Sequence, residues 1–481
     1  METVLEESRK QYMQLIVKPY FIFIASFAVL AVSYLFRGFV LSGQEPYFYL
    51  RLSDMILSNG IPSYDFLSFG GRAFLYPLGA PIILVILNYA FSLSIEKMII
   101  FSPLVFGFAS MVILYFILRK LKFSANVMSA VCYFVLLSPS FLYISNYFSH
   151  MTIPFFMNLA AFYFILSKKT FLRFLSLLIY LALPFFGFMH VFFGIIALFF
   201  YFKRFERISN FIPYIFVPIA TFALNFRFIT HFGFGVVSYE VENLISHISS
   251  FYGLSIFMII LVVLGLAFVW KSGKYKYNLL YLFILINIIM LSLNQDYIIY
   301  VTLIFSFIAA YGLRCIYRMK WSSILIRNLV LIILISGIIF SGFSFINENS
   351  EAVPDGQFID ALNFLNGKTF PREVILTHED YGVYVNTISK RKNFIDFNHA
   401  YAPRISDRLL FMEKMFQSKD LGLILDLFNE FNIKYILITP EMKSGLVWSR
   451  GDEGILYLLS NNPGSFRRIY NENGFEIWRV R

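Results

Sequence analysis

The chain has 481 residues, of which 58% are hydrophobic and only 14% are charged, and its mean hydropathy is +0.69. A soluble domain carries about 25% charged residues, so this composition excludes an ordinary soluble protein and indicates a polytopic α-helical membrane protein. The net charge of +11 comes from short basic groups between apolar segments, which favours a topological role over nucleic-acid binding.

Apolar segments of about 20 residues predict about eleven membrane spans. They begin at Pro19, Met98, Ala125, Met151, Phe171, Phe188, Ile208, Phe251, Tyr277, Tyr297 and Ser323. Lys and Arg mark the cytoplasmic side of a membrane. With the N-terminus inside, every second loop is basic, whereas the loops around 145–150 and 185–190 have no Lys or Arg. We therefore expect external loops at 37–96 and 227–250, and an external segment after residue 347.

The first external loop opens with "GQEPYFYLR". Pro46 suits the first position of a helix, so we expect a helix from Pro46 to Leu57 with Glu45 as its cap. A carboxylate at a helix N-terminus is favoured in its anionic form, which suits a metal ligand or a base. An ordinary interfacial helix with a capping Glu fits equally well. The apolar stretch from Tyr76 to Ser92 is expected to lie on or re-enter the membrane, because a crossing there would invert the basic loops.

Three further positions are candidates for chemistry. His150 lies in the turn "SNYFSHMTI", where a satisfied surface His is the simpler interpretation. His190 lies in an apolar segment, where an ionisable group is functional by default, although a neutral His bonded to a neighbouring helix fits as well. Glu240 lies in the 227–250 loop, which is long for a plain connection.

From residue 348 the composition changes to that of a soluble domain of about 130 residues, large enough to hold its own core. The segments "EVILTH", "NFIDF", "KYILITP", "SFRRIY" and "FEIWRV" predict strands. The segments "SDRLLFMEKMFQS", "LGLILDLFNEF" and "DEGILYLLS" predict amphipathic helices, the first and last with Ser or Asp caps. We therefore expect a transmembrane domain over 1–347 and an extracytoplasmic α/β domain over 348–481.

These segments, in this order, resemble the catalytic subunit of oligosaccharyltransferase, especially its archaeal and bacterial single-subunit forms, within the C-type (GT-C) glycosyltransferases. "EPYFYLR" is similar to the DPWFNYR-type motif of the family's first loop, and "SPSFLYISNYFSHMTI" to the segment with its second acidic motif. "VSYE", ending at Glu240, is similar to the motif of its mobile loop. "HEDYG" at 378–382 resembles the family's WWDYG motif.

The resemblance implies roles for particular residues. Glu45 takes the place of a catalytic, metal-binding Asp, His150 lies near a second metal ligand, and Glu240 closes over the site. The implied cofactor is a divalent metal, Mn or Mg. Acceptor binding falls on His378, Glu379, Asp380, Tyr381 and Gly382. Arg51, Arg72 and Arg227 are candidates for the donor phosphate, since Gln295 and Asp296 stand near the family's usual Arg.

The implied activity is transfer of a glycan from a polyprenyl- or dolichyl-linked donor to Asn of an acceptor protein on the extracytoplasmic face of the cell membrane. His378 and Glu379 replace both Trp residues of the family's motif, and the second acidic pair is absent. A GT-C enzyme that moves one sugar from a polyprenyl phosphate to a protein hydroxyl, a lipid or a glycan is the alternative. An inactive homologue, a scaffold that binds lipid-linked sugar and a lipid-sugar transporter are further alternatives. The expected partners are the lipid-linked donor, the acceptor protein or glycan and membrane lipid, without nucleic acid.

Overall fold

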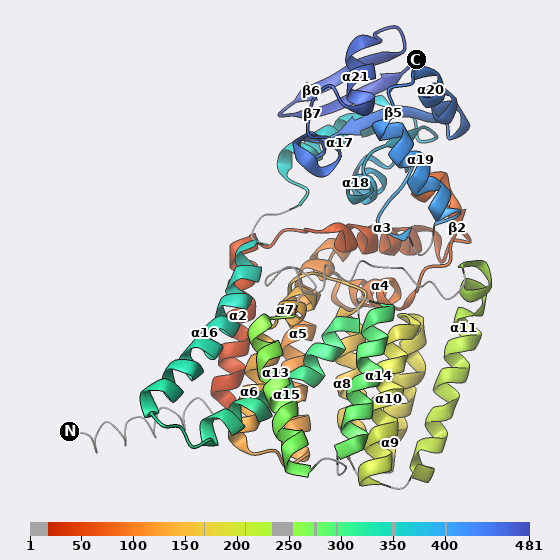
Figure 1. The fold of residues 1–481 in the computed structure, drawn as a ribbon. Coiled ribbons are helices and arrows are strands. Elements are labelled where there is room, and N and C mark those ends of the chain that lie inside the picture. The colour runs from red at the N-terminus through yellow and green to blue at the C-terminus, as the bar shows by residue number, and fades with distance from the viewer. Residues whose placement is uncertain are drawn as a thin grey trace. The chain divides into compact units, whose positions relative to one another are not determined.

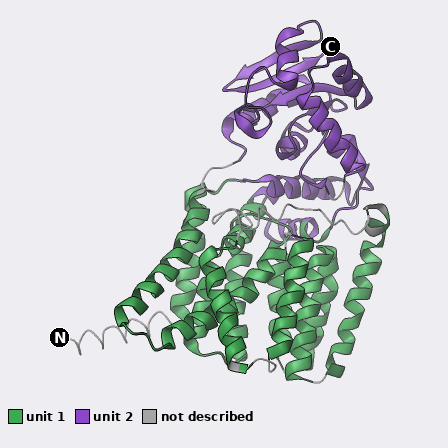
Figure 2. Cartoon of the chain, in the orientation of Figure 1, with its two compact units in different colours: residues 1–40, 77–80, 97–351 green, residues 41–76, 81–96, 352–481 purple. Residues whose placement is uncertain are grey.

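The computed structural model describes residues 18–167, 169–206, 208–232, 254–273, 277–294, 297–348, 353–399 and 402–481. The chain divides into two compact units (Figure 2). Unit 1 comprises Met1–Val40, Pro77–Ala80 and Lys97–Glu351, and unit 2 comprises Leu41–Tyr76, Pro81–Glu96 and Ala352–Arg481. The segment 41–76 therefore packs with the C-terminal residues. The domain boundary near residue 348 stays a prediction.

Unit 1 is helical (Figure 1). Its helices are α2 (Pro19–Arg37), α5 (Ile95–Lys120), α6 (Ala125–Leu136), α7 (Pro139–Asn146), α8 (Thr152–Ile165), α9 (Thr170–Ala182), η2 (Leu183–Phe185), α10 (Phe188–Phe205), η3 (Ile208–Ile215), α11 (Phe216–Phe232), α13 (Ile256–Gly273), α14 (Asn278–Leu293), α15 (Ile298–Arg318) and α16 (Ile324–Glu348). An apolar helix or a helix pair matches each of the eleven predicted spans.

Six helices of the described chain are long and apolar enough to cross a membrane, or seven if the pair α6 and α7, bent by 63°, is one span. The other four predicted spans are the shorter apolar helices α8, α9 with η2, α13 and α14. In the described residues, helix length and composition thus support six or seven crossings of a hydrocarbon core of about 30 Å. The other four predicted spans stay a prediction. Helix α4 (Gly79–Phe91) is also short, as expected for a segment that does not cross.

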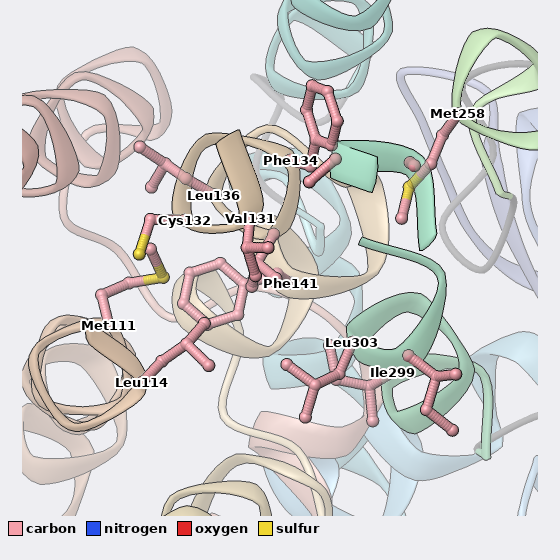
Figure 3. Close-up of a cluster of buried hydrophobic side chains, with 14 of the residues drawn as sticks. Met111, Leu114, Val131, Cys132, Phe134, Leu136, Phe141, Met258, Ile299 and Leu303 are labelled. Carbon is pink, nitrogen blue, oxygen red and sulfur yellow. The ribbon is translucent and has the colours of Figure 1, made fainter. Parts of the chain in front are cut away.

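The core of unit 1 is apolar side chains on α5, α6, α7, α13 and α15. Val131, Cys132 and Phe141 are fully buried there (Figure 3). Helices α13 and α15 lie close together. A Cβ at Gly312 would overlap the Leu261 carbonyl oxygen, and a Cβ at Gly265 would overlap the Ile308 carbonyl oxygen. Small residues let helix backbones meet in this way inside membranes, where packing replaces the hydrophobic effect.

Unit 2 is built on a five-stranded sheet, with strand order β4-β3-β5-β7-β6. The strands are β3 (Val374–Leu376), β4 (Lys392–Asn393), β5 (Ile433–Ile438), β6 (Phe466–Glu472) and β7 (Phe475–Val480). Strand β3 pairs in parallel with β4 and β5, and β7 pairs antiparallel with β5 and β6. Asn473 and Gly474, both with positive φ, join β6 to β7 in a two-residue hairpin turn. Four of the five predicted strands are confirmed, whereas only Asn393 of the predicted strand "NFIDF" lies in a strand, β4.

The helices of the C-terminal part are α17 (Gly356–Lys368), α18 (Glu379–Tyr384), η6 (Val385–Ser389), α19 (Ile405–Gln417), α20 (Leu421–Glu430), η8 (Met442–Leu446) and α21 (Gly454–Asn461). The three predicted helices are α19, α20 and α21. The expected caps are wrong, because Arg404 and Glu453 occupy the cap positions of α19 and α21 without a side-chain cap bond. Asp420 caps α20 instead.

Segment 41–76 contributes α3 (Gln44–Asn59), β1 (Tyr64–Asp65), η1 (Ser68–Gly70) and β2 (Arg72–Ala73). Phe69 is 1% exposed and belongs to the same core as β3, β5 and α19 to α21. Its backbone N–H donates to Asn393 Oδ1 at 2.7 Å, 324 residues later in the chain, and its carbonyl accepts from Arg408 Nη2 at 2.8 Å. The first loop is thus an integral part of the C-terminal core.

Candidate functional site

A buried ion pair holds the first loop in shape. Arg51 on α3 donates two hydrogen bonds to Asp65, from Nη1 at 2.8 Å and Nη2 at 3.0 Å, and one to Ser68. Tyr76 Oη donates to Asp65 Oδ2 at 2.7 Å. Burial raises the pKa of Asp65, but Arg51 outweighs it and holds that pKa well below its ordinary value. A bidentate pair of this kind is rigid, so it positions α3.

Helix α3 begins at Gln44, and Gly43, with a φ of 94°, occupies the cap position. The expectation that Glu45 caps this helix is therefore wrong. Glu45 lies in the first turn, where the helix dipole still favours its anionic form. The reason is Gly43, whose backbone conformation starts the helix two residues earlier.

A hydrogen bond joins the start of α3 to the start of α18. Gln44 Nε2 donates to Asp380 Oδ1 at 3.1 Å, although the two residues lie 336 positions apart. The Thr387 hydroxyl also donates to the Tyr47 carbonyl at 3.2 Å. The structure thus brings the first turn that carries Glu45 beside the polar turn "HEDYG".

His378 caps α18 and holds the Asp380 carboxylate. Its Nδ1 lies 3.1 Å from Asp380 Oδ2 and 3.4 Å from the Asp380 backbone N. The nitrogen donates to the carboxylate when it is protonated and accepts from the N–H when it is not. Burial raises the pKa of Asp380, but the hydrogen bonds from His378 and Gln44, with the charges of His378 and His399, lower it overall.

The other side chains of this turn are also held by named partners. Glu379 Oε2 lies 2.9 Å from His399 Nε2, at ion-pair distance but outside hydrogen-bond geometry. Tyr381 Oη donates to Glu441 Oε2 at 3.1 Å, and burial together with Glu441 raises the pKa of Tyr381. We call His378, Glu379, Asp380, Tyr381, His399 and Gln44 the polar cluster of unit 2. Two carboxylates and two imidazoles in it offer both donors and acceptors to a polar ligand.

Gly382 is required by packing. A Cβ at this position would overlap the Ile395 carbonyl oxygen and crowd Asn393 Nδ2 at 2.8 Å. The turn can therefore pack this closely against residues 393–395 only with glycine. This close approach is a structural role, whether or not Gly382 also contacts an acceptor.

The three predicted donor-phosphate arginines differ in their surroundings. Arg51 is occupied by Asp65. Arg72 is 3% exposed and lies over the rings of Phe69 and Tyr76, and its Nε and Nη2 have no hydrogen-bond partner among the described residues. Arg227 is an exposed residue of α11 in unit 1.

His150 and His190 meet in unit 1. Their ring centroids are 5.8 Å apart, and His190 Nδ1 lies 3.0 Å from Tyr300 Oη. Asn158 Nδ2 donates to Tyr300 Oη at 3.1 Å and to the His190 carbonyl at 3.2 Å. His190 is thus bonded within the helical unit, as one of the two interpretations of the sequence expected, and it brings a second imidazole to His150.

Sequence reasoning missed Arg37, the last residue of α2, which is 7% exposed. It lies at the predicted external end of the first span, where an Arg is disfavoured unless it has a use. An Arg at that position is the sequence signal that could have identified it as a candidate.

Among the described residues, no three His, Cys, Asp or Glu side chains are grouped so as to hold a metal ion. Glu45 belongs to unit 2 and His150 to unit 1, and Glu240 lies outside the described residues. The described side chains thus supply pairs of potential metal ligands and not a complete set of ligands for a metal ion. The predicted Mn or Mg site stays a prediction, and no chemical step is assigned to a metal below.

No family model and no curated protein matches the sequence, whereas solved structures match the fold. The oligosaccharyltransferase of Archaeoglobus fulgidus, tethered with an acceptor peptide containing the NVT sequon, aligns with a TM-score of 0.60 at 11% identity over 89% of this chain and 70% of that chain. Its complex with Zn and sulfate aligns with a TM-score of 0.61 at 13% identity over 95% and 73%. ArnT from Cupriavidus metallidurans, bound to undecaprenyl phosphate, aligns with a TM-score of 0.51 at 12% identity over 95% and 97%.

The chain is therefore a multi-pass membrane protein with a fold like that of the GT-C glycosyltransferases. The resemblance predicted from the sequence motifs is confirmed at the level of the fold. The matched structures include complexes with an acceptor peptide, with dolichol phosphate and with undecaprenyl phosphate.

Proposed function

We propose that this protein is a membrane glycosyltransferase that moves a glycan from a polyprenyl- or dolichyl-linked donor to an acceptor protein on the extracytoplasmic face. The observation that carries the proposal is the hydrogen bond from Gln44 to Asp380. It joins the carboxylate-bearing turn of the first loop to the "HEDYG" turn, and these two motifs carried the resemblance.

In inverting transfer, the acceptor atom attacks the anomeric carbon, the bond from that carbon to the donor phosphate oxygen breaks, and the acceptor gives up a proton. We assign Glu45 to orient the acceptor and take that proton, since the first turn of α3 favours its carboxylate. Asp380, kept anionic by His378 and Gln44, accepts a hydrogen bond from an acceptor hydroxyl or amide. Arg72, with two nitrogens open among the described residues, is a candidate to contact an anionic group of a substrate.

The polar cluster also suggests which acceptors fit. His378 and Glu379 stand where the family's motif has two Trp residues, and here they form ion pairs with Asp380 and His399. An acceptor at this turn meets charge and hydrogen-bonding groups in place of indole surfaces. We therefore expect recognition to depend on polar groups of the acceptor and to weaken at high salt.

Transfer of a single sugar from a polyprenyl phosphate is the second candidate function. The fold match to ArnT supports it, over 95% of this chain and 97% of that chain. Both candidates use a lipid phosphate leaving group. They differ in the size of the glycan transferred.

The experiment supplies the purified protein with a labelled polyprenyl-linked monosaccharide or oligosaccharide and an Asn-X-Thr peptide, and measures products by mass spectrometry. Glu45→Gln is expected to lower transfer by about 10²-fold or more, the scale of a general base. The matched control is Glu413→Gln on the exposed face of α19, which should leave transfer unchanged. Transfer that survives Glu45→Gln rejects the role of Glu45, and the mass gained by the peptide separates the two functions.

A further inference from the structure

Arg37 is a buried cation at the end of the first apolar helix. Its Nη1 donates to the Asn146 carbonyl at 2.5 Å. The guanidinium carbon lies 4.9 Å from the ring centroid of Tyr34 and 4.7 Å from that of Tyr147. Two ring faces and the final carbonyl of α7 therefore surround this side chain.

The charge of Arg37 has no carboxylate partner among the described residues, where no ion pair involves this side chain. Its Nε is buried and makes no hydrogen bond there. Ring quadrupoles and the C-terminal end of α7 supply only partial negative charge. By contrast, Arg51 is paired with Asp65 and Arg173 with Glu206.

A purely structural role of Arg37 does not explain why a charged side chain is buried here without a counter-charge. Tying α2 to the Asn146 carbonyl needs one N–H donor, which a neutral amide side chain also provides. Desolvating a full charge without a counter-charge costs several kcal/mol, and in a membrane protein such a group marks an anion or ion pathway by default. The simplest source of the missing counter-charge is an anionic ligand.

We propose that Arg37 binds the phosphate of an amphiphilic lipid, a polyprenyl phosphate, with its open Nε and fork of N–H groups directed to the phosphate oxygens. The inference rests on the proposed function for the choice of lipid. The setting favours a lipid over a free ion, because Leu35 and Phe36 on the same last turn are 66% and 61% exposed and offer an apolar surface to an isoprenoid chain.

The test measures binding without turnover. The purified protein in detergent is titrated with undecaprenyl phosphate, inorganic phosphate or phosphatidylglycerol, and dissociation constants are taken from the shift in unfolding temperature and from native mass spectrometry. The variant is Arg37→Gln, which removes the charge and keeps a neutral amide donor. The controls are Arg173→Gln, which breaks a paired Arg of the same unit, and Arg204→Gln, which removes an exposed one.

The proposal expects undecaprenyl phosphate to bind tightest, Arg37→Gln to weaken it at least tenfold, and both controls to bind like wild type. The unliganded Arg37→Gln protein should unfold at the same temperature as wild type or higher, because an uncompensated charge is gone. Binding unaffected by Arg37→Gln overturns the proposal. Equal binding of inorganic phosphate or phosphatidylglycerol overturns the assignment to a polyprenyl phosphate.

If Arg37→Gln fails to fold, Arg37→Lys replaces it, keeping the charge but losing the fork, and weakened binding is again expected. Failure of this inference is distinct from failure of the proposed function. Arg37-dependent binding without any glycosyl transfer rejects the function and keeps the site. Transfer and binding that ignore Arg37 reject the site and keep the function.

Discussion

At the scale of single residues, the site is a set of charges held by neighbours. Asp380 receives hydrogen bonds from Gln44 and His378, and Glu379 faces His399. Gln44 and Asp380 lie 336 positions apart in the sequence. The neighbouring residues His378, Glu379 and Asp380 look, in the sequence, like an ordinary solvent-exposed polar segment. Charge here is oriented before any ligand binds, which is what electrostatic positioning of an acceptor requires.

The lowered pKa of Asp380 makes a prediction about pH. Its favourable contacts stabilise the fold above its ordinary pKa of 3.8 and are lost as pH falls through the lowered folded-state pKa. Asp380→Asn should therefore lower the unfolding temperature near pH 5.5, and the difference from wild type should shrink below about pH 4. Thermal unfolding between pH 3 and 5.5 checks this, with the exposed Asp452→Asn as control. A difference that grows in acid would contradict it.

At the scale of elements, helix α18 is short and depends on its surroundings. It has six residues, a His cap and a continuation into η6. A helix of this length is not stable by itself, so tertiary contacts hold it. One of them is the close approach of Gly382 to the Ile395 carbonyl, which leaves no room for a Cβ.

Replacing Gly382 by Ala should lower the stability of unit 2 by about 1–3 kcal/mol, the cost of overpacking, and displace the polar cluster. Gly367→Ala in α17 is the matched control, because a Cβ there meets nothing within 4 Å. That substitution should leave stability unchanged or raise it, since Ala favours a helix over Gly. Thermal unfolding and the transfer assay of both variants measure the contrast. Equal unfolding temperatures for the two would refute the packing role.

At the scale of the whole molecule, the first loop and the C-terminal segment form one compact unit. Phe69 lies in the core of the C-terminal sheet, and its backbone is bonded to Asn393 and Arg408. The consequence is that the turn of Glu45 and the turn of Asp380 are held within one body. Binding groups from both ends of the sequence are thereby fixed to each other.

Phe69→Ala should destabilise unit 2 by about 3–5 kcal/mol, as expected for a buried Phe, and release the first loop. Phe66→Ala, three residues earlier and 65% exposed, should change stability by less than about 0.5 kcal/mol. Limited proteolysis of the loop and thermal unfolding provide the measurement. A loop in the Phe69→Ala protein that resists protease as well as wild type would count against this account.

Local patterns of the sequence were enough to predict much of this protein. β-branched and aromatic residues marked four of the five strands, and apolar segments marked a helix or helix pair at each predicted span, because buried residues are apolar and recur with the period of their element. Two expectations about helix caps failed. Gly43 replaced Glu45 at the cap of α3, and α19 and α21 start without the expected Ser or Asp caps. Helix α17 was not among the predicted helices.

Only the tertiary structure decided which distant residues meet. The insertion of Phe69, the bond from Gln44 to Asp380 and the contacts of Arg37 with α7 each join segments more than a hundred positions apart. Hydrophobicity and motif spacing describe what each residue needs, such as burial, a hydrogen bond or a counter-charge. They do not say which partner supplies it, because that depends on how the whole chain closes its cores.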